Sequence, residues 1–252
     1  MEHNSTNIDW RARLYISYAL TTGEHLELDA GQSHYLRNVL RCSIGEHVEL
    51  FNGKDGAFDA TIDEVTKKTV YVHIGEHTKP AEILPAIGLA FAPLKRERLD
   101  YLVQKAVEMG VTELVPVMTQ RTQGGRMNMD KLRANAIEAA EQCERVGLPI
   151  IGEPISLGDF LVGLAPTTKL IFCDEAVAGQ SAGLTNFPKG QSQDLKMVLV
   201  GPEGGFTEEE RQAIQSHPTC HSMALGPRIL RADTAIVAAL TLVQYHYGDW
   251  VQ

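Results

Sequence analysis

The chain lacks the composition of a fibrous or disordered protein. Only 11 of its 252 residues are Pro and 22 are Gly, while 44% are hydrophobic and 22% are charged. These values are typical of ordinary globular proteins. Cysteine is also scarce, and Cys42, Cys143, Cys173 and Cys220 form no C-x-x-C pair. Their apolar surroundings predict reduced, buried thiols and exclude both a disulfide scaffold and a cysteine-based zinc site.

Long apolar runs and an excess of basic residues are missing as well. No run approaches the ~18 residues that span a bilayer, and the polar start has no leader pattern. We therefore expect a cytoplasmic protein without a membrane partner. With 23 Lys and Arg against 32 Asp and Glu, the formal charge is −9. This charge argues against binding nucleic acid over the whole surface. Only residues 91–133 are net positive, with 8 basic and 5 acidic side chains.

Two patterns of apolar residues divide the chain. Short alternating runs predict strands at residues 14–16, 47–51, 58–62 and 69–74, with a hairpin turn at 52–56 and one helix at 33–41. Apolar runs at 86–92, 113–118, 169–173, 196–200 and 222–225 then alternate with helical stretches at 96–109, 129–145, 207–215 and 233–247. We therefore expect a small β-barrel or sheet over residues 1–78, and an α/β domain with a mostly parallel sheet over 79–252.

Two loops that follow predicted strands are candidates for a ligand site. Residues 201–205 read GPEGG, and Thr207 then caps a helix with three glutamates in its first turn. Those glutamates disfavour a pyrophosphate, so the loop is better suited to an uncharged ligand part such as a nucleoside. The second loop carries Arg228 and Arg231, which suit a phosphate, a carboxylate or a base edge. We expect one pocket between the loops, although a tight turn in the first and a helix cap at Asp233 explain the same residues structurally.

Three further patterns are less specific. Residues 179–183 match the hydrolase string G-x-S-x-G, but no strand ends there and no helix follows. His73 and His77 have H-x-x-x-H spacing, yet they lie at a strand end containing Gly, so we expect solvated histidines and no metal. Basic residues in the small domain and the first crossover predict an RNA groove between the domains, with ordinary solvated charges as the alternative. They are Arg11, Arg13, Arg37, Arg41, Lys95, Arg96, Arg98 and Arg121.

Six segments together resemble one protein family in their order and spacing. They are HYLRNVLR at 34–41, ELFNG at 49–53, VQKAVEMGV at 103–111, EAAEQ at 138–142, LVGPEGGF at 199–206 and LGPRILR at 225–231. With them the chain resembles the RsmE family, 16S ribosomal RNA uracil-N3 methyltransferases of the SPOUT superfamily. The resemblance implies a PUA-like β-barrel that binds RNA and an α/β domain with a C-terminal trefoil knot. It also implies S-adenosyl-L-methionine (SAM) as cofactor, a homodimer, and methylation of one uridine near the 3′ end of 16S rRNA in the small ribosomal subunit.

The chemistry of this reaction suggests roles for four residues. Arg231, supported by Arg228, would stabilise the charge that develops on uracil O2 and O4 once N3 loses its proton. Asp233 or Glu203 is the candidate proton acceptor, with loss of the proton to water as the alternative. Arg13, Arg37 and Arg41 match basic positions of the family. The cofactor pocket would be formed by Glu175, Ala176, Val200, Gly201, Pro202, Gly204, Gly205, Leu225, Gly226, Ile229 and Leu230.

Two departures from the family pattern stand out. The chain has Ala232 and Asp233 where the family usually has Thr and Glu, and residues 142–145 read QCER where QSGR is common. A shorter carboxylate keeps its charge, so we expect activity to be retained. The competing interpretation is a non-catalytic rRNA-binding or ribosome assembly factor, which would need a broken cofactor site. The intact loop at residues 201–205 argues against it.

Overall fold

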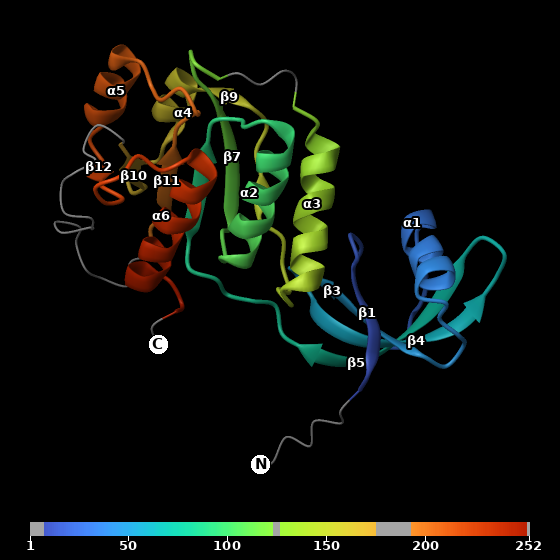
Figure 1. Cartoon of the computed structure of the whole chain (residues 1–252). Coiled ribbons are helices and arrows are strands. Elements are labelled where there is room, and N and C mark those ends of the chain that lie inside the picture. Colours follow the sequence, from blue (N-terminus) through green and yellow to red (C-terminus); the bar gives the residue numbers. More distant parts are fainter. Residues whose placement is uncertain (1–7, 123–126, 175–192, 251–252) are drawn as a thin grey trace. The chain divides into compact units, whose positions relative to one another are not determined.

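The structure is a computed structural model, and it describes residues 8–122, 127–174 and 193–250. The chain divides into two compact units (Figure 1). The first comprises Met1–Ile83 with Ala140–Leu148, and the second comprises Leu84–Ala139 with Pro149–Gln252.

The first unit is built on a five-stranded mixed sheet in the order β1-β3-β4-β5-β2. The strands are β1 (Trp10–Tyr15), β2 (His25–Glu27), β3 (His47–Asn52), β4 (Gly56–Val65) and β5 (Val70–Lys79). The predicted strands are present, while the three-residue β2 was not predicted. Strands β1 and β3 are parallel and the other pairs are antiparallel. Within the described residues no pairing closes β1 onto β2, so the expected barrel is not confirmed.

Local chemistry accounts for the turns of this unit. In the predicted hairpin, Asn52 faces Gly56, which has φ +97°. A Cβ at Gly56 would lie 2.2 Å from the carbonyl oxygen of Lys79, so only glycine fits there. The single helix predicted at residues 33–41 is instead α1 (Ala30–His34), followed by the π-helical turn η1 (Tyr35–Val39). It begins earlier because the carboxylate of Asp29 accepts from the N–H of Gln32 and caps it.

The last residues of the long helix α3 (Met129–Gln142) and the segment after it, Ala140–Leu148, also belong to the first unit. The Arg13 guanidinium donates to the carbonyl oxygens of Ala140 and Glu141 at 3.0 and 3.3 Å. The Glu141 carboxylate in turn accepts from the N–H of Tyr15 at 3.0 Å. Glu144, at the position where the family usually has Gly, adopts φ +61°, a conformation that favours glycine.

The second unit contains a parallel sheet in the order β12-β10-β11-β6-β7-β8, with β9 paired to β7. This confirms the predicted mixed α/β class with a mostly parallel sheet. The strands are β6 (Ile87–Phe91), β7 (Glu113–Met118), β8 (Ile150–Ile151), β9 (Ile155–Ser156), β10 (Lys169–Cys173), β11 (Lys196–Val200) and β12 (Cys220–Met223). The other helices are α2 (Arg96–Glu108), α4 (Leu157–Gly163), α5 (Glu208–Gln215) and α6 (Ala232–Tyr247).

Some boundaries of the second unit differ from the prediction. Strands β8 and β9 and helix α4 were not predicted, and β12 lies two residues earlier than expected. The proposed cap at Asp233 was wrong, because α6 begins at Ala232 with Arg231 as its N-cap residue. Among the described residues, no helix is both long and apolar enough to cross a membrane.

Parallel pairing sets the location of the site. Strand β10 lies between β11 and β12 and runs parallel to both. All three strands therefore end at the same edge of the sheet, where the segments after Cys173, Val200 and Met223 emerge together. Ligands of open α/β sheets bind at this edge.

Candidate pocket at the carboxyl edge of the parallel sheet

A cavity of about 230 Å³ lies at this edge, entirely within the second unit. Both predicted loops contribute to it, together with the end of β10 and the starts of α2 and α6. Apolar side chains and loop backbone form much of the wall, and three arginines reach it. The lining residues are Arg98, Cys173, Asp174, Val200, Gly201, Pro202, Glu203, Gly205, Phe206, Arg211, Ile229, Leu230, Arg231, Ala232 and Ala235.

The glycines of the first loop allow it to fold back on itself. A Cβ at Gly201 would lie 2.5 Å from the Phe206 ring, so the ring packs against the loop only because this position is glycine. Gly205 has φ +67°, and its N–H donates to the carbonyl of Pro202 at 2.9 Å. Phe206 also packs edge-on against Phe172 of β10, with ring centroids 5.4 Å apart. The loop is therefore anchored to the core of the sheet.

Helix α5 starts directly after this loop, as predicted. The Thr207 hydroxyl accepts from the N–H of Glu210, and the Glu210 carboxylate accepts from the N–H of Thr207, which forms a capping box. The second oxygen of Glu210 accepts from the N–H of Gln120 at 2.7 Å. Arg121, close by, donates to the carbonyl oxygens of Gly204 and Phe206 at 2.9 and 3.4 Å. The segment after β7 thus holds the loop from outside the pocket.

Arg98, in the first turn of α2, links the first loop to the start of α6 electrostatically. Its guanidinium forms an ion pair with Glu203 of the first loop. The Nε atom of Arg98 also lies 3.9 Å from a carboxylate oxygen of Asp233, in the first turn of α6. Both candidate proton acceptors therefore face one guanidinium.

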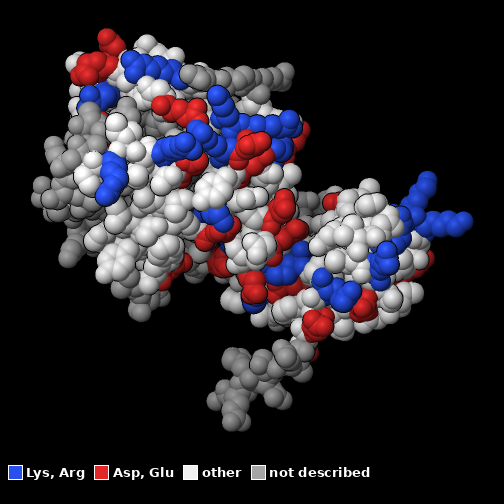
Figure 2. All heavy atoms as spheres, viewed as in Figure 1, with Lys and Arg blue, Asp and Glu red and all other residues white. Residues whose placement is uncertain are grey.

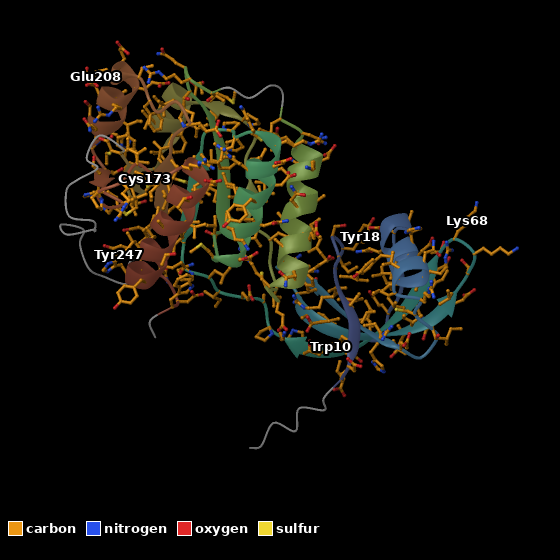
Figure 3. All side chains as sticks on the ribbon, in the orientation of Figure 1. Trp10, Tyr18, Lys68, Cys173, Glu208 and Tyr247 are labelled. Atoms are coloured by element: carbon orange, nitrogen blue, oxygen red, sulfur yellow. The ribbon has the colours of Figure 1, made fainter. Side chains whose placement is uncertain are left out.

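Asp174, directly after β10, places a buried carboxylate in the pocket lining. The Asp174 side chain is only 1% exposed and accepts two hydrogen bonds from Arg211 and one from Gln215. Burial raises the pKa of the neighbouring Cys173 thiol to about 12. Cys173 therefore stays protonated at neutral pH and is unsuited to act as a nucleophile. Figure 3 labels Cys173 at the end of β10 and Glu208 at the start of α5.

The pocket brings together only part of the predicted site. Of the residues predicted for cofactor binding or catalysis, it is lined by Val200, Gly201, Pro202, Glu203, Gly205, Ile229, Leu230 and Arg231. Among the remaining predictions, the lining does not include Gly204, Leu225, Gly226, Arg228 or Asp233. Glu175, Ala176 and the pattern at residues 179–183 lie outside the described residues.

Six lining residues were not predicted for any site. They are Cys173, Asp174, Phe206, Arg211, Ala232 and Ala235. An aspartate directly after a buried strand was the available signal for Asp174. Nothing in the sequence pairs it with an arginine on a helix 37 positions later.

The predicted RNA-binding residues fall into two groups. The Arg13 side chain is 11% exposed, forms an ion pair with buried Glu49 and lies 4.5 Å over the Phe51 ring, which argues against an RNA contact. Arg98 and Arg121 donate to the pocket loop, as described above. Arg11, Arg41, Lys95 and Arg96 are exposed, and Arg37 is half-buried and donates to the carbonyl of Thr66 at 3.3 Å. Figure 2 shows that basic and acidic side chains are intermixed on the visible face.

The histidine pattern shows no metal geometry. His73 packs against His25 with ring centroids 4.9 Å apart, and His77 packs against Phe58 at the same separation. The described part of the chain contains no group of three His, Cys, Asp or Glu side chains that could hold a metal ion.

Comparisons with known proteins agree with this architecture. Residues 82–244 match the family described as RNA methyltransferase domain, and residues 28–75 match the RNA methyltransferase PUA domain. The ribosomal RNA small subunit methyltransferase E of Rickettsia conorii is 32% identical over 92% of this chain and 94% of its own length. The protein of the same name from Buchnera aphidicola subsp. Schizaphis graminum is 29% identical over 94% and 97%.

Solved structures agree as well. A methyltransferase of Legionella pneumophila, in complex with bound SAM, has a TM-score of 0.84 and 33% identity, over 94% of this chain and 98% of its own. The ribosomal RNA small subunit methyltransferase E of Neisseria gonorrhoeae, also bound to SAM, has a TM-score of 0.84 and 27% identity, over 95% and 99%. These matches cover most of the chain, and the two loops predicted from the sequence form one pocket. The chain therefore belongs to the ribosomal RNA small subunit methyltransferase E family.

Proposed function

We propose that this protein transfers the methyl group of SAM to N3 of one uridine near the 3′ end of 16S rRNA in the small ribosomal subunit. Family membership supports the reaction class. The observation that carries the proposal is the meeting of the two loops, after β11 and before α6, in one pocket that also holds Arg231.

The pocket has the chemistry that SAM requires. Val200, Phe206 and Leu230 offer apolar surface to the adenosine part, and the backbone of Gly201 and Gly205 offers hydrogen-bonding groups. The pocket lining also includes charged side chains, namely Arg98, Asp174, Glu203, Arg211 and Arg231. When bound, SAM supplies a methyl group that its sulfonium sulfur has already made electrophilic. Gly204, Leu225 and Gly226, with Glu175 and Ala176, remain predicted contributors to the same site.

The protein's own residues must accept the N3 proton of uracil and stabilise the negative charge that its loss leaves on the base. Uracil N3 is a poor nucleophile until its proton leaves, and the resulting negative charge spreads over O2 and O4. Arg231 is exposed at the pocket wall, where its guanidinium can donate to such an oxygen. Arg228, exposed on the same loop, supports it through its charge. Glu203 and Asp233 both remain candidate acceptors for the N3 proton. Glu203 lines the pocket but is ion-paired with Arg98, and Asp233 lies 3.9 Å from the same guanidinium, outside the lining.

The remaining architecture follows from the same family. We propose that the sheet of the first unit is the PUA-like, RNA-binding barrel, which the match over residues 28–75 supports. The last third of the second unit would form the trefoil knot, and the protein would act as a cytoplasmic homodimer. The proposed RNA contacts are exposed Arg11, Arg41, Lys95 and Arg96, together with half-buried Arg37.

Purified protein tests the proposal directly. It should transfer labelled methyl from SAM to small subunits that lack the modification, and mass spectrometry of the rRNA should locate one N3-methyluridine. Arg231→Ala should reduce methyl transfer by about 100-fold or more, as loss of a transition-state donor does, and leave SAM affinity nearly unchanged. Arg228→Ala, which alters an arginine outside the pocket lining, should have a smaller effect.

One outcome would contradict the proposed reaction, and another would contradict the role of Arg231. A folded wild-type protein that binds SAM but transfers no methyl group would point to a non-catalytic rRNA-binding factor. If Arg231→Ala reduced SAM affinity and methyl transfer equally, Arg231 would be a cofactor-binding residue.

A further inference from the structure

A buried ion pair occupies one wall of the pocket and has no role in the reaction described above. Asp174, at the end of β10, accepts from Nε and Nη2 of Arg211 at 3.2 and 2.9 Å. Its second oxygen also accepts from the side chain of Gln215 at 3.0 Å. Both donors come from α5. Burying a carboxylate is costly, and a buried ion pair is weak evidence for a stabilising role, so its function must be sought elsewhere.

The pairing gives Arg211 a fixed orientation. Two donors on one edge of the guanidinium are held by the 1%-exposed carboxylate of Asp174, whereas the Arg211 side chain lines the pocket and is 23% exposed. The remaining group, Nη1, lies 3.2 Å from a carboxylate oxygen of Glu208, whose side chain is 65% exposed. An exposed pair of this kind is weak, so another carboxylate can replace Glu208 at Nη1.

The other pocket arginines have different partners. Arg98 is ion-paired with Glu203 and lies near Asp233. Arg231 is the proposed donor to the uracil base. Among the arginines that line the pocket, Arg211 is thus the one whose orientation is fixed by a fully buried carboxylate. The cofactor carries one negatively charged group, the carboxylate of its amino-acid part.

We propose that Arg211 binds the carboxylate of SAM, and that Asp174 and Gln215 are positioning residues that aim its guanidinium into the pocket. This inference rests on the proposed function, since it assigns one end of the same cofactor. A guanidinium held by a neighbouring carboxylate loses little freedom on binding, which strengthens its contact with the ligand.

Decarboxylated SAM provides a sharp test because it lacks only the carboxylate. Calorimetry without RNA should show that the wild-type protein binds SAM about 10- to 100-fold more tightly than decarboxylated SAM, the difference expected of a charge-assisted hydrogen bond. Arg211→Met should abolish this preference and leave the affinity for decarboxylated SAM unchanged. Asp174→Asn should reduce the preference, because Arg211 remains but loses its charged partner.

Controls separate this role from a purely structural one. Arg133→Met replaces an arginine of α3 that is paired with exposed Glu153, and it should keep the full preference. Arg211→Lys retains the positive charge but lacks the several N–H donors of a guanidinium, so it should show an intermediate preference for SAM. This variant keeps the test available if Arg211→Met fails to fold.

Two results would overturn the inference. One is an equal affinity of the wild-type protein for both ligands. The other is a loss of affinity in Arg211→Met, or in Arg211→Lys, that is the same for both ligands. If the folded wild-type protein bound neither ligand, the proposed function itself would fail, and that outcome is distinct from the other two.

Discussion

Replacing Arg13 with alanine should destabilise the first unit strongly. The Glu49 side chain is fully buried, and Arg13 is its ion-pair partner. Removing one member of a buried pair leaves an uncompensated charge, which typically costs about 3–5 kcal/mol. Lys79 lies 3.6 Å from the other oxygen of Glu49 and remains as a counter-charge, so we expect a loss near the lower end, about 3 kcal/mol.

Arg11→Ala is the matched control. Arg11 lies on the same strand, but its pair with Glu46 is exposed, with side-chain exposures of 42% and 35%. Exposed pairs contribute little to stability, so this variant should unfold at the wild-type denaturant concentration. Both arginines were predicted to bind RNA, and the two variants therefore separate a structural arginine from a surface arginine.

The first unit contains its own reporter. Trp10 of β1 donates from its indole N–H to Asp59 at 2.8 Å, and the chain has one other tryptophan, Trp250. Urea unfolding followed by fluorescence in a Trp250→Phe background reports on this unit, which matters because a two-unit chain need not unfold in one step. If Arg13→Ala and Arg11→Ala unfolded at the same urea concentration, the burial argument would be wrong.

Two further predictions concern stability. Glu144→Gly should raise the free energy of unfolding by about 1 kcal/mol, because glycine adopts φ +61° without the steric cost that glutamate bears. Glu144→Ala should give no such gain in the same urea titration, and an equal gain would point to charge instead of backbone conformation. The second prediction follows from burial, which raises the pKa of Cys173 from 9.0 to about 12 and that of Cys220 to about 11. Above about pH 9 the unfolded chain loses these protons while the folded chain keeps them, so the free energy of unfolding should fall as pH rises from 9 towards 12. Cys173→Ala should reduce this fall, and an unchanged slope would contradict the assignment.

Periodicity in the sequence predicted most of the second unit because its strands are buried on both faces. All five residues of β11 are buried, and this produces an uninterrupted apolar run. Strands β8 and β9 have two residues each, too few for any period to register. Helix α4 was missed because its seven residues include two glycines, which lower helix propensity; its cap, Ser156, is evident only with the structure.

Periodicity could not predict contacts between residues that lie far apart in the sequence. Residues 140–148 comprise the end of α3 and the segment after it, and they pack in the first unit through Arg13 and Glu141, although most of α3 belongs to the second unit. The left-handed backbone conformation of Glu144 could not be predicted either, because a glutamate does not indicate a positive φ as a glycine does.

Two arginines that contact the loop after β11 show what such pairing does to a charge-based prediction. Arg98 and Arg121 lie in the only net-positive stretch of the chain, which made them candidates for RNA phosphates. In the structure they contact the loop after β11, across 105 and 83 positions of sequence. A guanidinium that donates to a loop has fewer donors left for phosphate. RNA affinity in the second unit should therefore depend more on exposed Lys95 and Arg96, at the start of α2, than on Arg98 and Arg121.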